Sequence, residues 1–234
     1  MTARDQVVRV LRAGGHVARL GAVLPLATGV RLYGDTDKGR HGYVPGYVDH
    51  LGPRRWRIQR LLEIGVGGYS SRHPGGSLRV WRDYLPRATI VGLDISDKDV
   101  RLGPRVRFVQ GDQCDPATLD RAVAALGGPP DVVIDDGSHL DDHAAVSFRH
   151  LFPNMATGAL YVIEDLHTSY WPHYGGGWPA PDESAIGLIR SLTDDVQAAD
   201  PVFAWLPELP RPVGDRFAVA AVDIRPGIAF VTRG

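Results

Sequence analysis

Five short apolar runs, separated by segments with helical periodicity, constrain the fold of this chain more than any other feature of its sequence. The runs lie at residues 60–64, 89–93, 106–110, 131–134 and 159–163. Near-continuous apolar runs of this length are typical of parallel strands that are buried on both faces. Residues 78–84, 116–126 and 141–151 have the spacing of helices, and Asp115 is placed to cap the second of them. This alternation predicts a doubly wound α/β fold with a mainly parallel sheet.

The ends of the chain add elements to this core. Residues 5–18 predict a short helix, residues 35–43 a loop, residues 170–181 an aromatic loop rich in Gly and Pro, and residues 182–197 a further helix. Residues 217–224 and 228–232 flank Arg225-Pro226-Gly227 and predict a hairpin that adds an antiparallel strand. We therefore expect one Rossmann-like domain over residues 1–234, with a mostly parallel sheet of seven strands and a short helical extension over residues 1–34.

The composition excludes several classes of partner. The 234 residues carry a formal net charge of −1, so there is no basic excess to neutralise the phosphates of a nucleic acid. No apolar run approaches the ~20 residues that cross a bilayer, and the N-terminus lacks the pattern of a secretory signal. A single cysteine fits a reducing compartment. These features predict a cytoplasmic protein without nucleic-acid or membrane partners.

A glycine-rich turn follows the first predicted strand. Ligands of doubly wound sheets bind at the carboxyl ends of the strands, where Gly65 and Gly67 let the backbone approach a nucleoside closely. Asp94 ends the next strand and is placed to accept hydrogen bonds from both ribose hydroxyls. Asp112 and Gln113 end the third strand and are placed to bracket an adenine. The turn therefore predicts a nucleoside site.

Two nucleoside cofactors fit this turn. NAD would indicate an oxidoreductase, but the GxGxxG pattern needs a tight third position, and Ser70 here begins a longer polar loop. Glu63, directly before the glycines, favours S-adenosylmethionine. An NAD-dependent oxidoreductase and a non-catalytic adenosylmethionine-binding protein remain as alternative functions. A tight strand-to-helix turn that binds no ligand is the alternative without a function.

A group of acidic residues closes the fourth and fifth predicted strands. Asp135 and Asp136 follow one strand, Glu164 and Asp165 follow its neighbour, and carboxylates crowded in this way are costly to ionise together. A hard divalent cation such as Mg²⁺ relieves that cost, since it prefers oxygen ligands. The sequence therefore predicts a metal site formed by Asp136, Glu164 and Asp165, although turn and strand-end chemistry alone would also place acidic residues here.

His139 lies beside this acidic group and is predicted to act as a general base. A metal lowers the pKa of a bound hydroxyl, and a nearby imidazole takes the proton as a methyl group arrives. The alternative is a structural histidine at a helix start. His139-Leu140-Asp141 also fits part of the facial triad of iron oxygenases, but that triad usually occupies a β-barrel, whereas the alternation here favours α/β.

Several segments together resemble a known family. They are TDKG at 36–39 with Tyr43, LEIGVGG at 62–68, GLDI at 92–95, GDQ at 111–113, IDDGSH at 134–139 and YVIEDLHTSYW at 161–171. In these motifs the chain resembles the metal-dependent sugar O-methyltransferases of macrolide and related antibiotic pathways, of the mycinamicin 2''-O-methyltransferase type. The resemblance runs from about residue 35 to residue 177.

The resemblance implies adenosylmethionine as methyl donor, Mg²⁺ as metal, a sugar hydroxyl of a glycosylated natural product as acceptor, and an oligomer. It places Asp136, Glu164 and Asp165 at the metal and His139 as the base. The cofactor site would include Thr36, Glu63, Gly65, Gly67, Asp94, Asp112, Gln113 and Asp135. Lys38 would contact cofactor or substrate. Independently of the resemblance, aromatic faces stack well on sugars and polyketides, so the loop at 170–178 is predicted to close over the acceptor, with simple loop packing as the alternative. A non-sugar acceptor also remains open.

Overall fold

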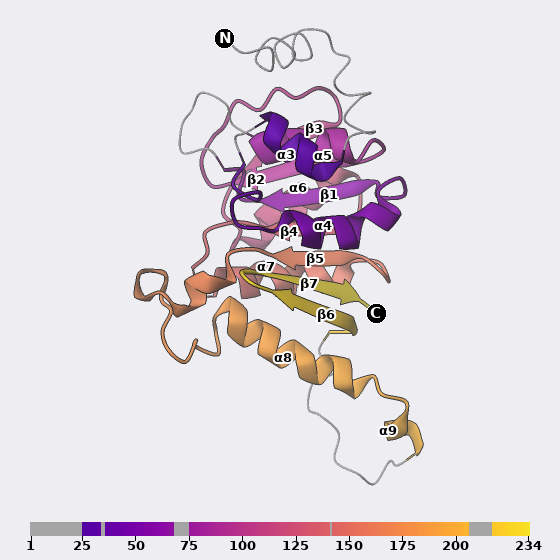
Figure 1. The fold of residues 1–234 in the computed structure, drawn as a ribbon, viewed down its shortest axis with the longest axis vertical. Helices are drawn as coiled ribbons and strands as arrows, with labels where there is room; N and C mark the ends of the chain where they lie inside the picture. The colour runs from indigo at the N-terminus through magenta and orange to yellow at the C-terminus, as the bar shows by residue number, and fades with distance from the viewer. Residues whose placement is uncertain (1–24, 34–35, 68–74, 141, 206–216) are drawn as a thin grey trace.

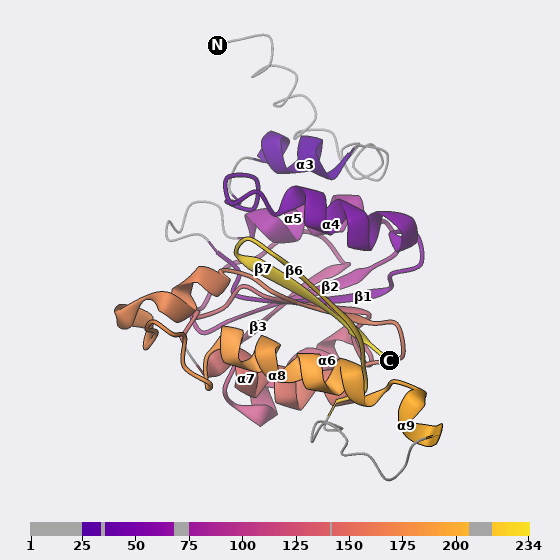
Figure 2. The ribbon, with the colours of Figure 1, turned by 60° about the horizontal axis from the view of Figure 1, so that its bottom comes forward.

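A single seven-stranded sheet with helices on both faces forms the centre of the molecule (Figures 1 and 2). The computed structural model describes residues 25–33, 36–67, 75–140, 142–205 and 217–234. The helix predicted over residues 5–18 lies outside these residues. Within them, no helix combines the length and the hydropathy that crossing a lipid bilayer requires.

The strands follow the order β3-β2-β1-β4-β5-β7-β6. They are β1 (Arg60–Ile64), β2 (Thr89–Asp94), β3 (Val106–Gln110), β4 (Val132–Asp135), β5 (Leu160–Ile163), β6 (Val219–Arg225) and β7 (Ile228–Arg233). Pairings among β1 to β5 are parallel, and β7 pairs antiparallel with both β5 and β6. The predicted α/β fold with an antiparallel C-terminal strand is therefore confirmed.

Helices cover both faces of the sheet, as Figure 2 shows. On one face lie α3 (Leu26–Tyr33), α4 (Val44–Leu51) and α5 (Gly76–Tyr84), and on the other α6 (Pro116–Leu126), α7 (His143–Leu151) and α8 (Ala185–Ala198). Shorter helical segments are η1 (Gly52–Arg54), η2 (Phe152–Asn154), η3 (Leu166–Tyr170), η4 (Pro172–Tyr174) and α9 (Val202–Trp205). The short helices η3 and η4 lie in the segment joining β5 to α8, and η4 falls within the predicted loop at 170–181.

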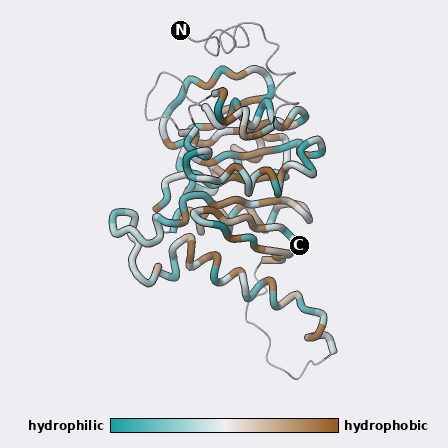
Figure 3. Tube along the Cα trace, viewed as in Figure 1, coloured by the Kyte–Doolittle hydropathy of each residue, from teal (hydrophilic) through white to brown (hydrophobic). Residues whose placement is uncertain are grey.

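Alternate residues of the strands pack into two apolar cores, one on each face of the sheet. On β1, Leu61 packs with the core under α3 to α5, and Leu62 packs with the core under α6 to α8. In Figure 3 the hydrophobic stretches of the chain lie mainly along the strands and helices, and the connecting loops are more hydrophilic. The predicted cap of α6 is confirmed, because the Asp115 side chain accepts a hydrogen bond from the amide of Ala117.

The strand order also fixes where a ligand can bind. The chain moves outward from β1 to β3 on one side, and β4 returns to the other side of β1. In such sheets the crevice at this switch point, beyond the carboxyl ends of the strands, is the ligand site. The glycine turn after β1 and the acidic residues after β4 and β5 therefore meet at one edge.

Candidate active site

The glycine turn after β1 packs directly against the loop that follows β4. Gly65 has φ +80°, and an added Cβ at this position would overlap the backbone carbonyl of Asp136. The amide of Gly65 donates to the carbonyl of Leu93 at 2.8 Å. A side chain at position 65 is therefore excluded by both backbone conformation and space.

Asp94, at the end of β2, is held at this turn. Its Oδ2 accepts hydrogen bonds from the amide of Val66 at 3.0 Å and from Lys98 Nζ at 2.7 Å, and its Oδ1 accepts from the amide of Ser96 at 2.9 Å. Lys98 Nζ also lies 2.8 Å from the carbonyl oxygen of Gly67. The carboxylate predicted to bind ribose is thus fixed in position by the turn itself.

Gln113 links the ends of β3 and β4. Its Nε2 donates to Asp135 Oδ1 at 3.2 Å, and its Oε1 accepts from the amide of Ser138 at 2.9 Å. Asp135 is buried and also accepts hydrogen bonds from Tyr161 and Ser147. Burial raises the pKa of Asp135, although these hydrogen bonds oppose the shift. Both residues thus orient the loop after β4, and their contact with a cofactor stays a prediction.

Asp112 and Thr36 differ from these buried groups. Asp112 is exposed, and its Oδ1 accepts from the amide of Cys114 at 2.8 Å. Thr36 is partly buried in the turn that leads to Lys38. Both lie in polar segments, and their predicted roles at the cofactor also stay predictions.

Glu63 is fully buried beside α5. Its Oε2 accepts from Ser77 Oγ at 2.7 Å and its Oε1 from Trp81 Nε1 at 3.1 Å. Lys38 Nζ lies 3.4 Å from the same Oε1. Burial raises the pKa of Glu63, with the Lys38 charge acting in the opposite direction. Protein donors therefore occupy both oxygens, and the predicted cofactor contact of Glu63 remains a prediction.

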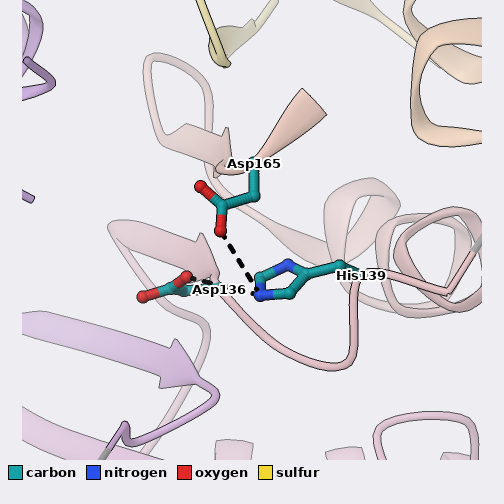
Figure 4. A group of neighbouring side chains, drawn as sticks. All are labelled: Asp136, His139 and Asp165. Carbon is teal, nitrogen blue, oxygen red and sulfur yellow. Dashed lines mark ion pairs between the residues drawn. The ribbon is translucent and has the colours of Figure 1, made fainter. Parts of the chain in front are cut away.

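Asp136, His139 and Asp165 converge at the ends of β4 and β5, as Figure 4 shows. His139 Nε2 lies 3.5 Å from Asp165 Oδ2 and 4.0 Å from Asp136 Oδ1. One ligand atom from each of the three side chains lies within 4.8 Å of the other two. His139 and Asp165 also adopt left-handed backbone conformations, with φ of 57° and 54°. Such conformations are costly for residues with a Cβ and are concentrated at functional sites.

Lys38 is an internal cation for this group. Its Nζ lies 2.8 Å from Asp136 Oδ2 and 2.8 Å from Glu164 Oε1, and its side chain is buried. Burial alone would lower the pKa of Lys38, but Asp136, Glu164 and Glu63 together hold it well above its usual value. Lys38 and Lys98 are the only lysines in the sequence, and both contact carboxylates at this edge of the sheet.

Glu164 and Asp165 have opposite electrostatic environments although they are neighbours in sequence. Burial and the Asp136 charge raise the pKa of Glu164 to about 8, and Tyr47 donates a hydrogen bond to the same oxygen that Lys38 contacts. Burial also raises the pKa of Asp165. A hydrogen bond from Tyr43 at 2.7 Å and the nearby histidines outweigh this effect, so the net shift of its pKa is downward. Asp165 therefore stays ionised at neutral pH.

These donors fit a hard divalent ion. Asp136 and Asp165 each direct a carboxylate oxygen toward one point beside His139, and carboxylate oxygen is the ligand type that Mg²⁺ prefers. Two of the three predicted ligands are thus brought together, while Lys38 and Tyr47 engage Oε1 of the third, Glu164.

Sequence reasoning missed several residues that support the site. Tyr47, Ser77, Trp81 and Tyr161 bind the carboxylates from helices and strands, where aromatic and small side chains indicate only an apolar core. Tyr43 was part of the family motif, which was the one signal available for it. The others could be found only from the way the elements pack.

Known proteins resemble this chain over most of its length, although no family model matches it. It is 41% identical over 216 residues to 8-demethyl-8-alpha-L-rhamnosyl tetracenomycin-C 2'-O-methyltransferase of Streptomyces olivaceus, covering 91% of this chain and 56% of the relative. It is 44% identical over 203 residues to Mycinamicin VI 2''-O-methyltransferase of Micromonospora griseorubida, covering 83% and 48%. The chain therefore spans about half the length of these curated relatives.

A solved structure agrees with these relatives. The MycE methyltransferase from the mycinamycin biosynthetic pathway, in complex with Mg, SAH and mycinamycin VI, matches with a TM-score of 0.78 and 40% identity. The match covers 90% of this chain and 54% of that one. The resemblance derived from the sequence motifs is confirmed, and the alternative of an NAD-dependent oxidoreductase is not favoured.

Proposed function

Because this chain is related to the sugar O-methyltransferases of antibiotic biosynthesis, we propose that it transfers a methyl group from adenosylmethionine to a sugar hydroxyl of a glycosylated natural product. One observation carries the proposal. His139 converges with Asp136 and Asp165 at the same sheet edge as a glycine turn and the carboxylate of Asp94, which is predicted to bind ribose. A donor site and a deprotonation site side by side are what methyl transfer to a hydroxyl needs.

The donor would lie across the carboxyl ends of β1 to β3. Gly67, where an added Cβ meets nothing within 4 Å, leaves the backbone of the turn open to the nucleoside, while Gly65 lets the turn pack against the loop after β4. Asp94 would accept the ribose hydroxyls. Asp112 and Gln113 would border the adenine, and Thr36 would also contact the cofactor. The sulfonium is already activated, so the chain has to position the acceptor and remove its proton.

Asp136, Asp165 and Glu164 would hold a Mg²⁺ ion. When bound, the ion orients the acceptor hydroxyl and lowers its pKa. Lys38 holds Oδ2 of Asp136 and Oε1 of Glu164, so these carboxylates keep one fixed orientation. Ionised Asp165 supplies negative charge to the ion at neutral pH.

His139 would take the proton of the acceptor hydroxyl. The carboxylates of Asp165 and Asp136 lie 3.5 Å and 4.0 Å from Nε2, so they stabilise the positive charge that the ring gains. A general base of this kind contributes roughly 10²–10⁴-fold to the rate. Assembly into a homo-oligomer is a further part of the proposal and rests on the resemblance alone.

The experiment is methyl transfer from labelled adenosylmethionine to mycinamicin VI and to 8-demethyl-8-alpha-L-rhamnosyl tetracenomycin C, with Mg²⁺ or with EDTA. We expect Mg²⁺-dependent label on the sugar of at least one acceptor, and about 10²-fold less with His139→Gln at unchanged affinity for S-adenosylhomocysteine. Binding of NAD in place of the donor, or full turnover in EDTA, would contradict the proposal.

A further inference from the structure

Five aromatic rings form a continuous arc around Asp165, which we call the aromatic arc. Successive ring centroids lie 6.1 Å apart for His41 and His167, 4.7 Å for His167 and Trp171, 6.1 Å for Trp171 and Tyr174, and 6.3 Å for Tyr174 and His139. Both ends of the arc reach the Asp165 carboxylate, through His41 Nδ1 at 3.1 Å and His139 Nε2 at 3.5 Å. The arc therefore borders the metal and base side of the site.

Backbone hydrogen bonds fix the segment that carries the arc. The amide of Trp171 donates to the carbonyl of Thr168 at 2.9 Å, and the amides of Gly176 and Gly177 return to the carbonyls of Trp171 and Ser169. An added Cβ at Gly176 would clash with the backbone of Ser169, so the turn also needs this glycine. The backbone that carries Trp171 and Tyr174 is thus fixed by the chain's own hydrogen bonds, so a ligand need not order it.

Two indoles on this segment remain open to solvent. Trp171 is 45% exposed and Trp178 is 87% exposed, and Trp178 packs on Tyr170 at 5.4 Å between ring centroids. Aromatic faces bind apolar rings well, and grouped exposed aromatics beside a site mark a binding surface. The segment at 166–181 contains no Lys or Arg, so it offers no permanent cation for a phosphate group. Its chemistry suits an uncharged, partly apolar ring system.

We propose that the aromatic arc binds the acceptor sugar on the faces of Trp171 and Tyr174, and that Tyr170 and Trp178 bind the apolar aglycone attached to it. Tyr174 contacts the ring of His139, so a sugar stacked there has its hydroxyl beside the base. The acceptor is then an assembled glycoside, and a glycosyl transfer step precedes this methylation. This inference rests on the proposed function.

The test compares pairs of tryptophans with similar exposure. Trp171, 45% exposed, is matched by Trp56, which is 49% exposed and lies before β1, at the opposite edge of the sheet. Trp178, 87% exposed, is matched by Trp205, which is 81% exposed at the end of α9. Each is changed to Ala, and Trp171→Phe retains an aromatic face. The protein is saturated with S-adenosylhomocysteine, and binding of mycinamicin VI and of methyl α-L-rhamnoside is measured by calorimetry alongside turnover.

We expect Trp171→Ala to weaken binding of both probes about tenfold, and Trp178→Ala to weaken binding of mycinamicin VI alone by a similar factor. Trp171→Phe should recover most of the loss, while Trp56→Ala and Trp205→Ala should match the wild type. Equal binding by Trp171→Ala and Trp56→Ala overturns the inference.

The two proposals fail in different ways. Wild-type protein that binds mycinamicin VI in a Trp171-dependent manner but transfers no methyl group would refute the proposed function and leave the acceptor site standing. Methyl transfer that is unchanged by replacement of Trp171 and of Trp178 would refute the acceptor site and leave the proposed function standing. A wild-type protein that neither binds nor methylates either glycoside refutes both.

Discussion

Replacing Lys38 by Met removes the internal cation and keeps most of the side-chain volume. In the wild type the ammonium lies 2.8 Å from Asp136, 2.8 Å from Glu164 and 3.4 Å from Glu63, all from a buried position. Without it, the carboxyl groups of Asp136, Glu164 and Glu63 face one another with no compensating cation. Breaking a buried ion pair by removing one partner costs about 3–5 kcal/mol.

Protonation of a carboxyl group limits how much stability the Lys38→Met variant loses. The wild type already holds a proton on Glu164 at pH 7, so the variant takes up a further proton on Glu63, whose ordinary pKa is 4.5 and whose upward shift by burial the Lys38 charge opposes. Holding that proton at pH 7 costs about 3 kcal/mol, since each pH unit above the ordinary pKa is worth about 1.4 kcal/mol. The folded-state pKa is raised, so the variant is least affected near pH 4.5 and loses stability as the pH rises. The deficit should therefore shrink by about 2–3 kcal/mol between pH 7 and pH 5.

Urea unfolding in EDTA at pH 7 and pH 5 measures this effect, with Lys98→Met as the matched control. Lys98 pairs with Asp94, whose two oxygens keep hydrogen bonds from the amides of Val66 and Ser96, so its removal should cost no more than about 2 kcal/mol at either pH. A Lys38→Met variant within about 1 kcal/mol of the wild type at pH 7, or a deficit that does not change with pH, would refute the reasoning.

Three further predictions concern the same edge of the sheet. Burial and Asp136 raise the pKa of Glu164 to about 8, so metal-free protein should lose roughly 3–4 kcal/mol of stability as the pH rises from 5 to 8. Glu164→Gln should flatten that slope in thermal unfolding, and parallel slopes would contradict it. Gly65→Ala places a Cβ against the backbone of Asp136 and should destabilise the fold by about 3 kcal/mol or more in the same urea assay. At Gly67 the added Cβ has no atom within 4 Å, so Gly67→Ala should cost only about 1 kcal/mol. Asp165→Asn should weaken Mg²⁺ binding about tenfold or more in calorimetry while S-adenosylhomocysteine binding stays unchanged, and equal Mg²⁺ affinity would remove Asp165 from the ligand set.

The fold was predictable because its signals are local. A buried parallel strand needs a short apolar run, so β1 and β3 begin and end where the pattern indicated, and β4 is displaced by one residue, with Asp135 closing the strand. The hairpin of β6 and β7 followed from Arg225-Pro226-Gly227 in the same way. The short helix α9 was not predicted, since a segment of four residues carries too little periodicity to detect.

The sequence alone determined which residue types end which strands, and this was enough to place Asp94, Asp136, His139 and Asp165 at one edge of the sheet. The partners of those residues were decided only by the tertiary structure. Lys38 precedes α4 in the chain, yet its ammonium lies between carboxylates from β4 and β5. No local pattern contains that information, because burial of a charge depends on groups more than a hundred positions away, as in the pair of Lys38 and Glu164.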